Sequence, residues 1–271
     1  MRLRPPDWLI YGLAVAVILT LALNRRERVS APPAPPPVPG EAQMPVAGDS
    51  PFATAPMVAV QASALRAGAT AVSAGAAGVW LTAATNVEAC VKPGLVVADG
   101  RAVPAKRGAL SGKLRILTTA DGTPGLPLAG AGDLRPGEAG FTAGFPEGGP
   151  GEVALRLIGP VMLRTAPRIQ PNGPALAWAE VGRTEGLNGA RMGLVGAPVM
   201  DAHGRVAGIV LSQAPRRGLV FTSLPDDVRR ALAKTPLGAE GQAEPIGADN
   251  YGRAADDLRR VLSVIQLVCL G

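Results

Sequence analysis

The chain has 271 residues, enough for one two-lobed domain or two small ones. It contains 35 glycines and 27 prolines, only 3% aromatic residues, and a net charge of +6. Many turn residues and few long periodic segments favour an all-β fold over an α/β fold. The positive charge is spread over scattered arginines rather than a basic stripe with stacking aromatics, which argues against nucleic-acid binding.

An uncharged apolar segment, Trp8–Leu23, lies near the N-terminus. As a helix its 16 residues span ~24 Å, slightly less than a ~30 Å hydrocarbon core. We expect an uncleaved transmembrane signal anchor at residues 8–24, after a cytoplasmic N-terminus at residues 1–7. A cleaved signal peptide is the alternative, although Thr20-Leu21-Ala22 is a poor cleavage site. Arginines on both sides of the segment leave its orientation open.

A proline-rich linker is predicted at residues 25–53. Six of the ten residues Ala31–Gly40 are proline, which favours a stiff, extended spacer over a folded element. Such a spacer would hold a folded domain away from the membrane surface.

From Met57 onwards, short apolar runs alternate with glycine, proline, asparagine and aspartate. This pattern predicts strands bounded by turns. The predicted strands are Val58–Ala62, Gly78–Ala83, Gly94–Val97, Lys113–Leu117, Ala139–Ala143, Val153–Ile158, Leu176–Val181, Pro198–Met200, Val206–Leu211 and Leu219–Thr222. We expect the chain to cross from one lobe to another at Gly132–Pro136.

The last segment, residues 237–271, is predicted to be a linker and a C-terminal helix. Within Tyr251–Leu270 the apolar residues recur at helical spacing, at Leu258, Val261, Leu262, Ile265 and Val268. We expect this helix to pack against the first lobe. Its use as a docking helix for a partner is the alternative.

Several segments of the body match, in chain order, the signature segments of one enzyme family. Val79–Cys90 resembles the segment that carries a general-base histidine, and Lys113–Leu117 resembles the strand whose aspartate orients that histidine. Ala143–Gly148 resembles a "GYPxG" turn, and Gly193–Pro198 resembles the nucleophile loop G-x-S-G-G-P. The family is the bacterial trypsin-like serine peptidases, including the periplasmic quality-control type, and the resemblance covers roughly Met57 to Lys234.

This resemblance implies two packed antiparallel six-stranded barrels at residues 54–236, with lobes at about 54–134 and 137–236 and a cleft between them. It also implies that all three catalytic positions are substituted. Thr85 stands at the histidine position, Lys113 at the aspartate position and Val195 at the serine position. A valine has no proton to give up and no lone pair with which to attack, so we expect a catalytically degenerate member without a catalytic triad. The backbone amides of Gly193 and Val195 are expected to keep an oxyanion-hole-like arrangement.

Two other groups of residues could in principle provide a catalytic base. The only histidine of the chain, His203, lies in Asp201-Ala202-His203-Gly204, which is typical of an exposed turn between strands. A serine–lysine dyad of Ser111 and Lys113 is conceivable, because residues two apart share a face of a strand. Nothing in the sequence desolvates that lysine or supplies an oxyanion site, so neither arrangement is favoured.

The chain has two cysteines, Cys90 and Cys269. Relatives with a cysteine at the position of Cys90 often pair it within the same lobe, but no cysteine precedes Cys90 here. We therefore hypothesise a Cys90–Cys269 disulfide that ties the C-terminal helix to the first barrel, and two buried free thiols are the alternative. One histidine and two distant cysteines form no metal-ligand cluster, and no cofactor is expected.

The sequence thus predicts a single-pass protein of the bacterial inner membrane with a periplasmic trypsin-like domain. We expect it to bind a protein or peptide partner of the envelope by sheet-edge addition rather than to hydrolyse it. Two alternatives stay open: an active peptidase whose triad lies elsewhere, and a structural subunit of a membrane complex.

Overall fold

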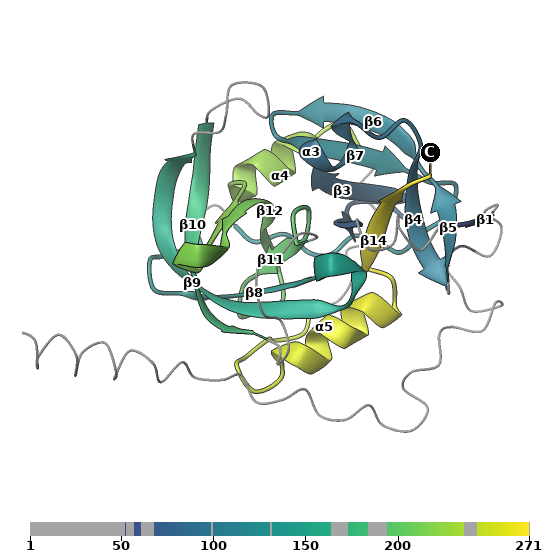
Figure 1. Ribbon diagram of the computed structural model, residues 1–271. Coiled ribbons are helices and arrows are strands. Elements are labelled where there is room, and N and C mark those ends of the chain that lie inside the picture. Colours follow the sequence, from purple (N-terminus) through teal and green to yellow (C-terminus); the bar gives the residue numbers. More distant parts are fainter. Residues whose placement is uncertain are drawn as a thin grey trace, which may run out of the picture. The chain divides into compact units, whose positions relative to one another are not determined.

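The computed structural model describes residues 52, 57–60, 68–98, 100–130, 132–163, 173–183, 194–235 and 243–270. Its strands are β1 Val58–Ala59, β2 Ala69–Ser73, β3 Val79–Ala83, β4 Pro93–Ala98, β5 Arg101–Pro104, β6 Lys106–Ser111, β7 Leu114–Thr118, β8 Ala139–Gly144, β9 Gly151–Leu163, β10 Gly173–Arg183, β11 Pro198–Met200, β12 Val206–Ala214, β13 Leu219–Thr222 and β14 Val264–Cys269. The α-helices are α3 Thr85–Glu88, α4 Pro225–Leu232 and α5 Tyr251–Arg260, and the 3₁₀ turns are η1 Pro146–Gly148 and η2 Pro215–Arg217. The described chain is therefore mainly β, as the composition predicts, and its strands form two lobes (Figure 1).

The first lobe is an open sheet with the strand order β1-β5-β4-β14-β2-β3-β7-β6. The sequence-based expectation of a closed six-stranded barrel is wrong for this lobe. Only Ala105 separates β5 from β6, so these two strands form no hairpin with each other. Instead β5 pairs with β4, and β6 pairs with β7. As a result β1 and β6 remain the two edges of the sheet.

The second lobe is a closed barrel with the order β10-β13-β12-β11-β8-β9, as the resemblance predicts. Its longest strands are β9 and β10, and β10 pairs with residues 153–163 of β9 with two irregularities in register. One irregularity lies beside Gly159, where φ is +143°, a value that favours glycine. Such bulges increase the bend of a strand and help a sheet to close.

Each lobe has a fully buried tryptophan at its centre. The Trp80 indole donates a hydrogen bond of 2.9 Å to Thr119 Oγ1, and the Trp178 indole donates one of 3.0 Å to Thr222 Oγ1. A buried indole N–H needs an acceptor, and these threonines satisfy it. A third apolar cluster, which includes Leu81 and Ile209, contains residues of both lobes and joins them.

The predicted helix over Tyr251–Leu270 is correct only in its first half. Helix α5 ends at Arg260, and residues 264–269 form strand β14 between β4 and β2 of the first lobe (Figure 1). The helix end is a Schellman motif, in which Ser263 N donates to Leu258 O at 2.8 Å and Leu262 N donates to Arg259 O at 3.1 Å. Leu262 takes the left-handed conformation, with φ of +58°, at the position where glycine is usual.

Helix α5 packs mainly on β8 and β9 of the second lobe, not on the first lobe as we expected. Arg259 Nη2 lies 2.8 Å from Glu152 Oε2 on β9, and both side chains are at least nine-tenths buried. The Tyr251 ring stacks on Phe141 of β8 with centroids 5.8 Å apart. A buried charge pair and a stacked ring pair thus fix the helix to the second lobe, while β14 returns the chain to the first lobe.

All ten predicted strands are present: β11 and β13 have the predicted bounds, and the other eight have shifted ends. Four strands had not been predicted: β2, β5, β6 and β14. Strand β2 consists only of alanine, threonine, valine and serine, and β6 is exposed along most of its length, so neither has a strong apolar pattern. The crossing between lobes lies between β7 and β8, in the segment that contains Gly132–Pro136.

The predicted N-terminus, signal anchor and linker, residues 1–53, lie outside the described residues except for Phe52. Within the described part, no helix is both long enough and apolar enough to span a bilayer.

Candidate functional site

The structure brings the segments around Thr85, Lys113 and Val195 together. Ala84 N, immediately before Thr85, donates a hydrogen bond of 2.8 Å to Lys113 O. Asn86 Nδ2, immediately after Thr85, donates one of 2.8 Å to Val195 O. The two neighbours of Thr85 in the chain therefore connect it to the other two positions, which lie in separate parts of the sequence.

The loop that contains Val195 is held tightly by backbone hydrogen bonds and close packing. Gly196 N donates to Val210 O, and Val210 N donates to Ala197 O, both at 2.8 Å, so the loop is attached to β12. Gly196 has φ of +90°, and a Cβ atom there would lie only 2.1 Å from Thr70 O. Any residue other than glycine would therefore force the loop away from β2. Leu194 is fully buried, and Gly193, the other predicted oxyanion-loop residue, lies outside the described residues.

A small hydrogen-bond network holds this loop against the first lobe. Asn86 Nδ2 also donates to Thr82 Oγ1 at 2.9 Å, and Thr82 Oγ1 donates to Thr70 O at 2.7 Å. Thr70 N donates to Val195 O at 3.3 Å, and Thr70 Oγ1 accepts from Phe145 N of the second lobe at 3.2 Å. Thr70 and Thr82 are fully buried, where unpaired polar groups are costly, so the network rigidly joins the lobes at this point.

Sequence reasoning did not single out Asn86, Thr82 or Thr70. Each is an ordinary polar residue within an otherwise apolar segment. Only the fold shows that Asn86 reaches a residue 109 positions away in the chain.

Lys113 lies in the turn between β6 and β7 and faces the second lobe. Its Nζ donates a long hydrogen bond of 3.5 Å to Gly173 O at the start of β10. Partial burial lowers the pKa of the Lys113 ammonium below its usual value, and the negative charge of Asp227 on α4 offsets part of this effect. The side chain thus lies partly buried between the lobes, within the field of the Asp227 carboxylate.

These three side chains offer no means of acyl transfer among themselves. Valine lacks a nucleophilic atom, threonine lacks a basic nitrogen, and a protonated lysine cannot accept a proton. Ser111 and Lys113 do not share a strand face as the sequence suggested, because Ser111 ends β6 and Gly112, with φ of +57°, begins the turn.

His203 lies elsewhere, in the turn between β11 and β12. Its side chain is 74% exposed, and Nδ1 lies 3.9 Å from Asp201 Oδ2. Asp201 instead stabilises the turn through hydrogen bonds. Its Oδ1 accepts one from the backbone N of His203 and one from that of Arg205, each at 2.9 Å. The aspartate shapes the turn, as the Asp-x-His-Gly pattern predicts.

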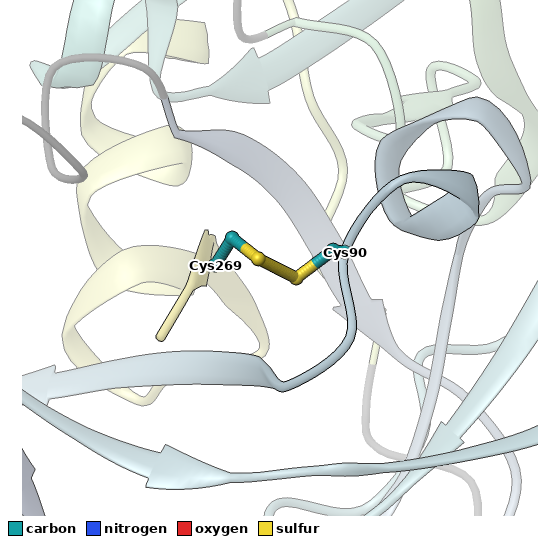
Figure 2. Close-up of a disulfide and its surroundings, with 2 residues drawn as sticks. All are labelled: Cys90 and Cys269. Carbon is teal, nitrogen blue, oxygen red and sulfur yellow. A yellow bond between two sulfur atoms is a disulfide. The ribbon is translucent and has the colours of Figure 1, made fainter. Parts of the chain in front are cut away.

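The predicted Cys90–Cys269 disulfide is present (Figure 2). The two Cα atoms are 5.5 Å apart, a usual spacing for a bridge. It joins Cys90, two residues beyond the end of α3, to Cys269 at the end of β14, so it attaches a strand to the first lobe rather than the helix we expected. Among the described residues, no group of histidine, cysteine, aspartate or glutamate side chains could hold a metal ion.

Comparisons with known proteins place the fold. No protein-family model matches the sequence, and no curated protein matches it. Among solved structures, the HtrA-type protease AlgW with a decapeptide matches 61% of this chain with 17% identity and a TM-score of 0.50. This chain covers 50% of the length of that AlgW chain.

Two further structures are similar. The active form of the Rv3671c protease from M. tuberculosis has 19% identity over 66% of this chain and 82% of its own, with a TM-score of 0.49. The apo MamO protease domain from Magnetospirillum magneticum has 18% identity over 66% of this chain and 95% of its own, with a TM-score of 0.47. The closed second barrel and the AlgW match agree with the resemblance seen in the sequence, and the chain therefore has the fold of the trypsin-like, HtrA-type serine proteases.

Proposed function

We propose that this protein is a membrane-anchored pseudoprotease of the bacterial envelope, which binds an extended polypeptide and does not hydrolyse it. The convergence of Thr85, Lys113 and Val195 carries the proposal. Three segments matched to the peptidase pattern by sequence alone are linked by direct hydrogen bonds, which supports the assignment of these positions. Each then bears a side chain that cannot perform the role of the catalytic group it replaces.

The position of the single histidine supports the same proposal. A serine or cysteine nucleophile normally needs a base within hydrogen-bond reach, most often histidine. His203 is largely exposed, and both its side chain and its backbone N lie against the Asp201 carboxylate. A base for a relocated triad would have to be a residue of another type.

A polypeptide could still be bound by strand addition at β12. This strand pairs with β11 only from Val206 to Ile209, whereas it pairs with β13 from Val210 to Ala214. Among the described residues, no strand pairs with the other edge of Leu211–Ala214. Backbone groups on a free edge can bind an extended peptide without any catalytic side chain. The free edge begins beside the loop of Val195, where a peptidase would hold its substrate.

In our proposal, the predicted anchor at residues 8–24 attaches this binding domain to the membrane through the proline-rich linker. The sequence supports this part, because an uncharged apolar segment is followed by a proline-rich stretch whose composition favours an extended spacer. The disulfide is compatible with an oxidising compartment such as the periplasm.

The proposal can be tested with the full-length protein in detergent. Wild-type protein is incubated with a fluorophosphonate probe and, separately, with fluorescein-labelled casein, and trypsin is the positive control. We expect no covalent labelling and no casein fragments, while fluorescence anisotropy reports binding of intact casein. Casein fragments that increase in proportion to the protein added, together with probe labelling, would show an active peptidase and refute the proposal.

A further inference from the structure

Strand β6 forms one edge of the first-lobe sheet, and this edge is strongly basic (Figure 1). Between Gly100 and Ala120 the chain has five basic residues and no acidic residue. Lys106 and Arg107 are exposed on β6 itself. Neither forms an ion pair with any residue that the structure describes, and the same holds for Arg115 on β7. The edge therefore carries positive charge that the described part of the fold does not neutralise.

The pairing of β6 with β7 places two of these arginines on either side of an exposed leucine. Arg115 and Leu117 are two positions apart on β7 and therefore share a face. Leu110 pairs with Arg115, and Arg107 pairs with Leu117, so both side chains lie on that face as well. Arg115 Nη1 donates a hydrogen bond of 3.2 Å to Gly108 O, which holds the guanidinium against the edge strand. Leu110 is 55% exposed.

We call Lys106, Arg107, Leu110 and Arg115 the cationic edge. Helix α4 packs on the opposite face of this hairpin from Arg115, in the apolar cluster that contains Leu114 and Ile116. The two carboxylates in the first turn of α4 each pair with an arginine of the same helix. Helix α4 therefore covers one face of the hairpin without balancing the charge of the cationic edge.

The chemistry of the cationic edge fits an anionic lipid surface better than a polymer. The regular pairing of β6 is interrupted between Arg107 and Leu110, and irregular, charged edge strands oppose the addition of a further strand. Strands β6 and β7 contain no aromatic residue on which a nucleic-acid base could stack. Cations around an exposed apolar side chain match a bilayer interface, where phosphates bind the cations and the apolar group enters the headgroup region.

The lobe that carries the cationic edge is also the lobe through which the chain enters the fold. Phe52 stacks on Trp80 with ring centroids 5.7 Å apart, and β1 pairs with β5. The predicted anchor at residues 8–24 is thus tethered to the first lobe. A tether raises the effective concentration of lipid at that lobe, so even a weak contact with the bilayer becomes populated.

We propose that the cationic edge docks the first lobe on an anionic lipid bilayer, with its three cations at lipid phosphates and Leu110 in the headgroup region. The inference rests on the membrane-anchored part of the proposed function and adds the surface that faces the bilayer. Because the contact is mainly electrostatic and lies at the protein surface, salt weakens it.

The test uses full-length protein in lipid nanodiscs of phosphatidylcholine alone or of equal parts of phosphatidylcholine and phosphatidylglycerol. An environment-sensitive fluorophore is attached at Ala109→Cys, an exposed position of β6, because both native cysteines are in the disulfide. Two charge-matched variants are compared in this background: Lys106→Gln/Arg107→Gln and the control Arg216→Gln/Arg217→Gln. Each removes two adjacent, exposed positive charges, and the control pair lies in the turn between β12 and β13 of the second lobe.

We expect the fluorophore emission to shift to the blue in discs with phosphatidylglycerol, to stay unshifted in phosphatidylcholine discs, and to return at high salt. The site variant should lower the ratio of docked to undocked protein by about tenfold, and the control should leave it unchanged. Leu110→Ser, which keeps every charge, should reduce the blue shift because the apolar contact is lost.

Equal shifts in the two kinds of disc, or equal losses in the two charge variants, would overturn the inference and leave the anchor intact. A shift that appears in detergent without discs would indicate contact with a second copy and would also overturn it. Failure of the protein to co-elute with phosphatidylcholine discs would instead refute the anchor of the proposed function. Docking is then judged by co-elution with the phosphatidylglycerol discs alone, and its absence there would overturn the inference as well.

Discussion

At the scale of single residues, the residue types at Thr85, Lys113 and Val195 could be read directly from the sequence. The contacts that hold the site could not. Asn86 bonds Val195 across 109 positions, and no local pattern reports such a pair. Likewise the sequence does not predict that the helix ends at Leu262 in the left-handed conformation, because the residue that usually marks such an end is glycine.

Asn86→Leu should destabilise the protein. The change keeps the side-chain volume similar but removes the donor to Val195 O and Thr82 Oγ1, at a cost of about 1–3 kcal/mol for poorly satisfied buried groups. Urea unfolding followed by circular dichroism measures the loss. Thr82→Val tests the same network, and the double variant should lose less than the two single losses together. Strictly additive losses would show that the two residues are independent.

Tyr251→Phe should leave stability unchanged or raise it by about 1 kcal/mol near neutral pH, because Tyr251 Oη is buried and has no hydrogen-bond partner in the described structure. The ring stack on Phe141 is retained in the variant. Chemical unfolding at pH 7 measures this difference. A clear loss of stability in the variant would show that the hydroxyl makes a favourable contact.

The same residue predicts an alkaline pH dependence. Burial, together with the negative charge of Glu152, raises the pKa of Tyr251 from 10.0 to about 12. The unfolded chain therefore ionises this tyrosine first, and wild-type stability falls as pH rises from 10 towards 12. Tyr251→Phe should show a smaller fall over this range, by roughly 1.4 kcal/mol per unit of pKa difference. Parallel stability curves for the two proteins would contradict the shifted pKa.

At the scale of elements, helical spacing misled the prediction at the C-terminus. Leu258, Val261, Leu262, Ile265 and Val268 fit a helix, but residues 264–268 are buried on both faces of a sheet. A strand covered on both sides shows no alternation of apolar and polar residues, so its pattern resembles a buried helix. Its place between β4 and β2 depends on pairing with strands far away in the chain.

The disulfide that secures β14 should contribute strongly to stability. Cys90→Ser/Cys269→Ser removes a bridge between residues 179 positions apart, and chain entropy predicts a loss of about 5 kcal/mol. Urea unfolding of wild type, with and without reductant, and of the double variant measures it. Reduced wild type should match the variant. A loss below about 1 kcal/mol would mean that the sheet alone holds β14 in place.

At the scale of the whole molecule, the order of the matched segments was enough to predict the two-lobed fold and the closed second barrel. The open first lobe was not predictable from that order. It results from the near-continuous run of β5 into β6 and from the insertion of a strand from the far end of the chain. Helix α5 on the second lobe and β14 in the first then connect the two lobes a second time, in addition to the crossing between β7 and β8.

The most direct test of the account is to restore the triad in the full-length protein. Thr85→His/Lys113→Asp/Val195→Ser is compared with wild type and with Thr85→His/Lys113→Asp/Val195→Ala, and fluorophosphonate-labelled peptides are identified by mass spectrometry. We predict that only the variant with serine at position 195 is labelled, at that position. Labelling of the wild type, at any residue, would contradict the central claim that this trypsin-like fold has lost its catalytic machinery.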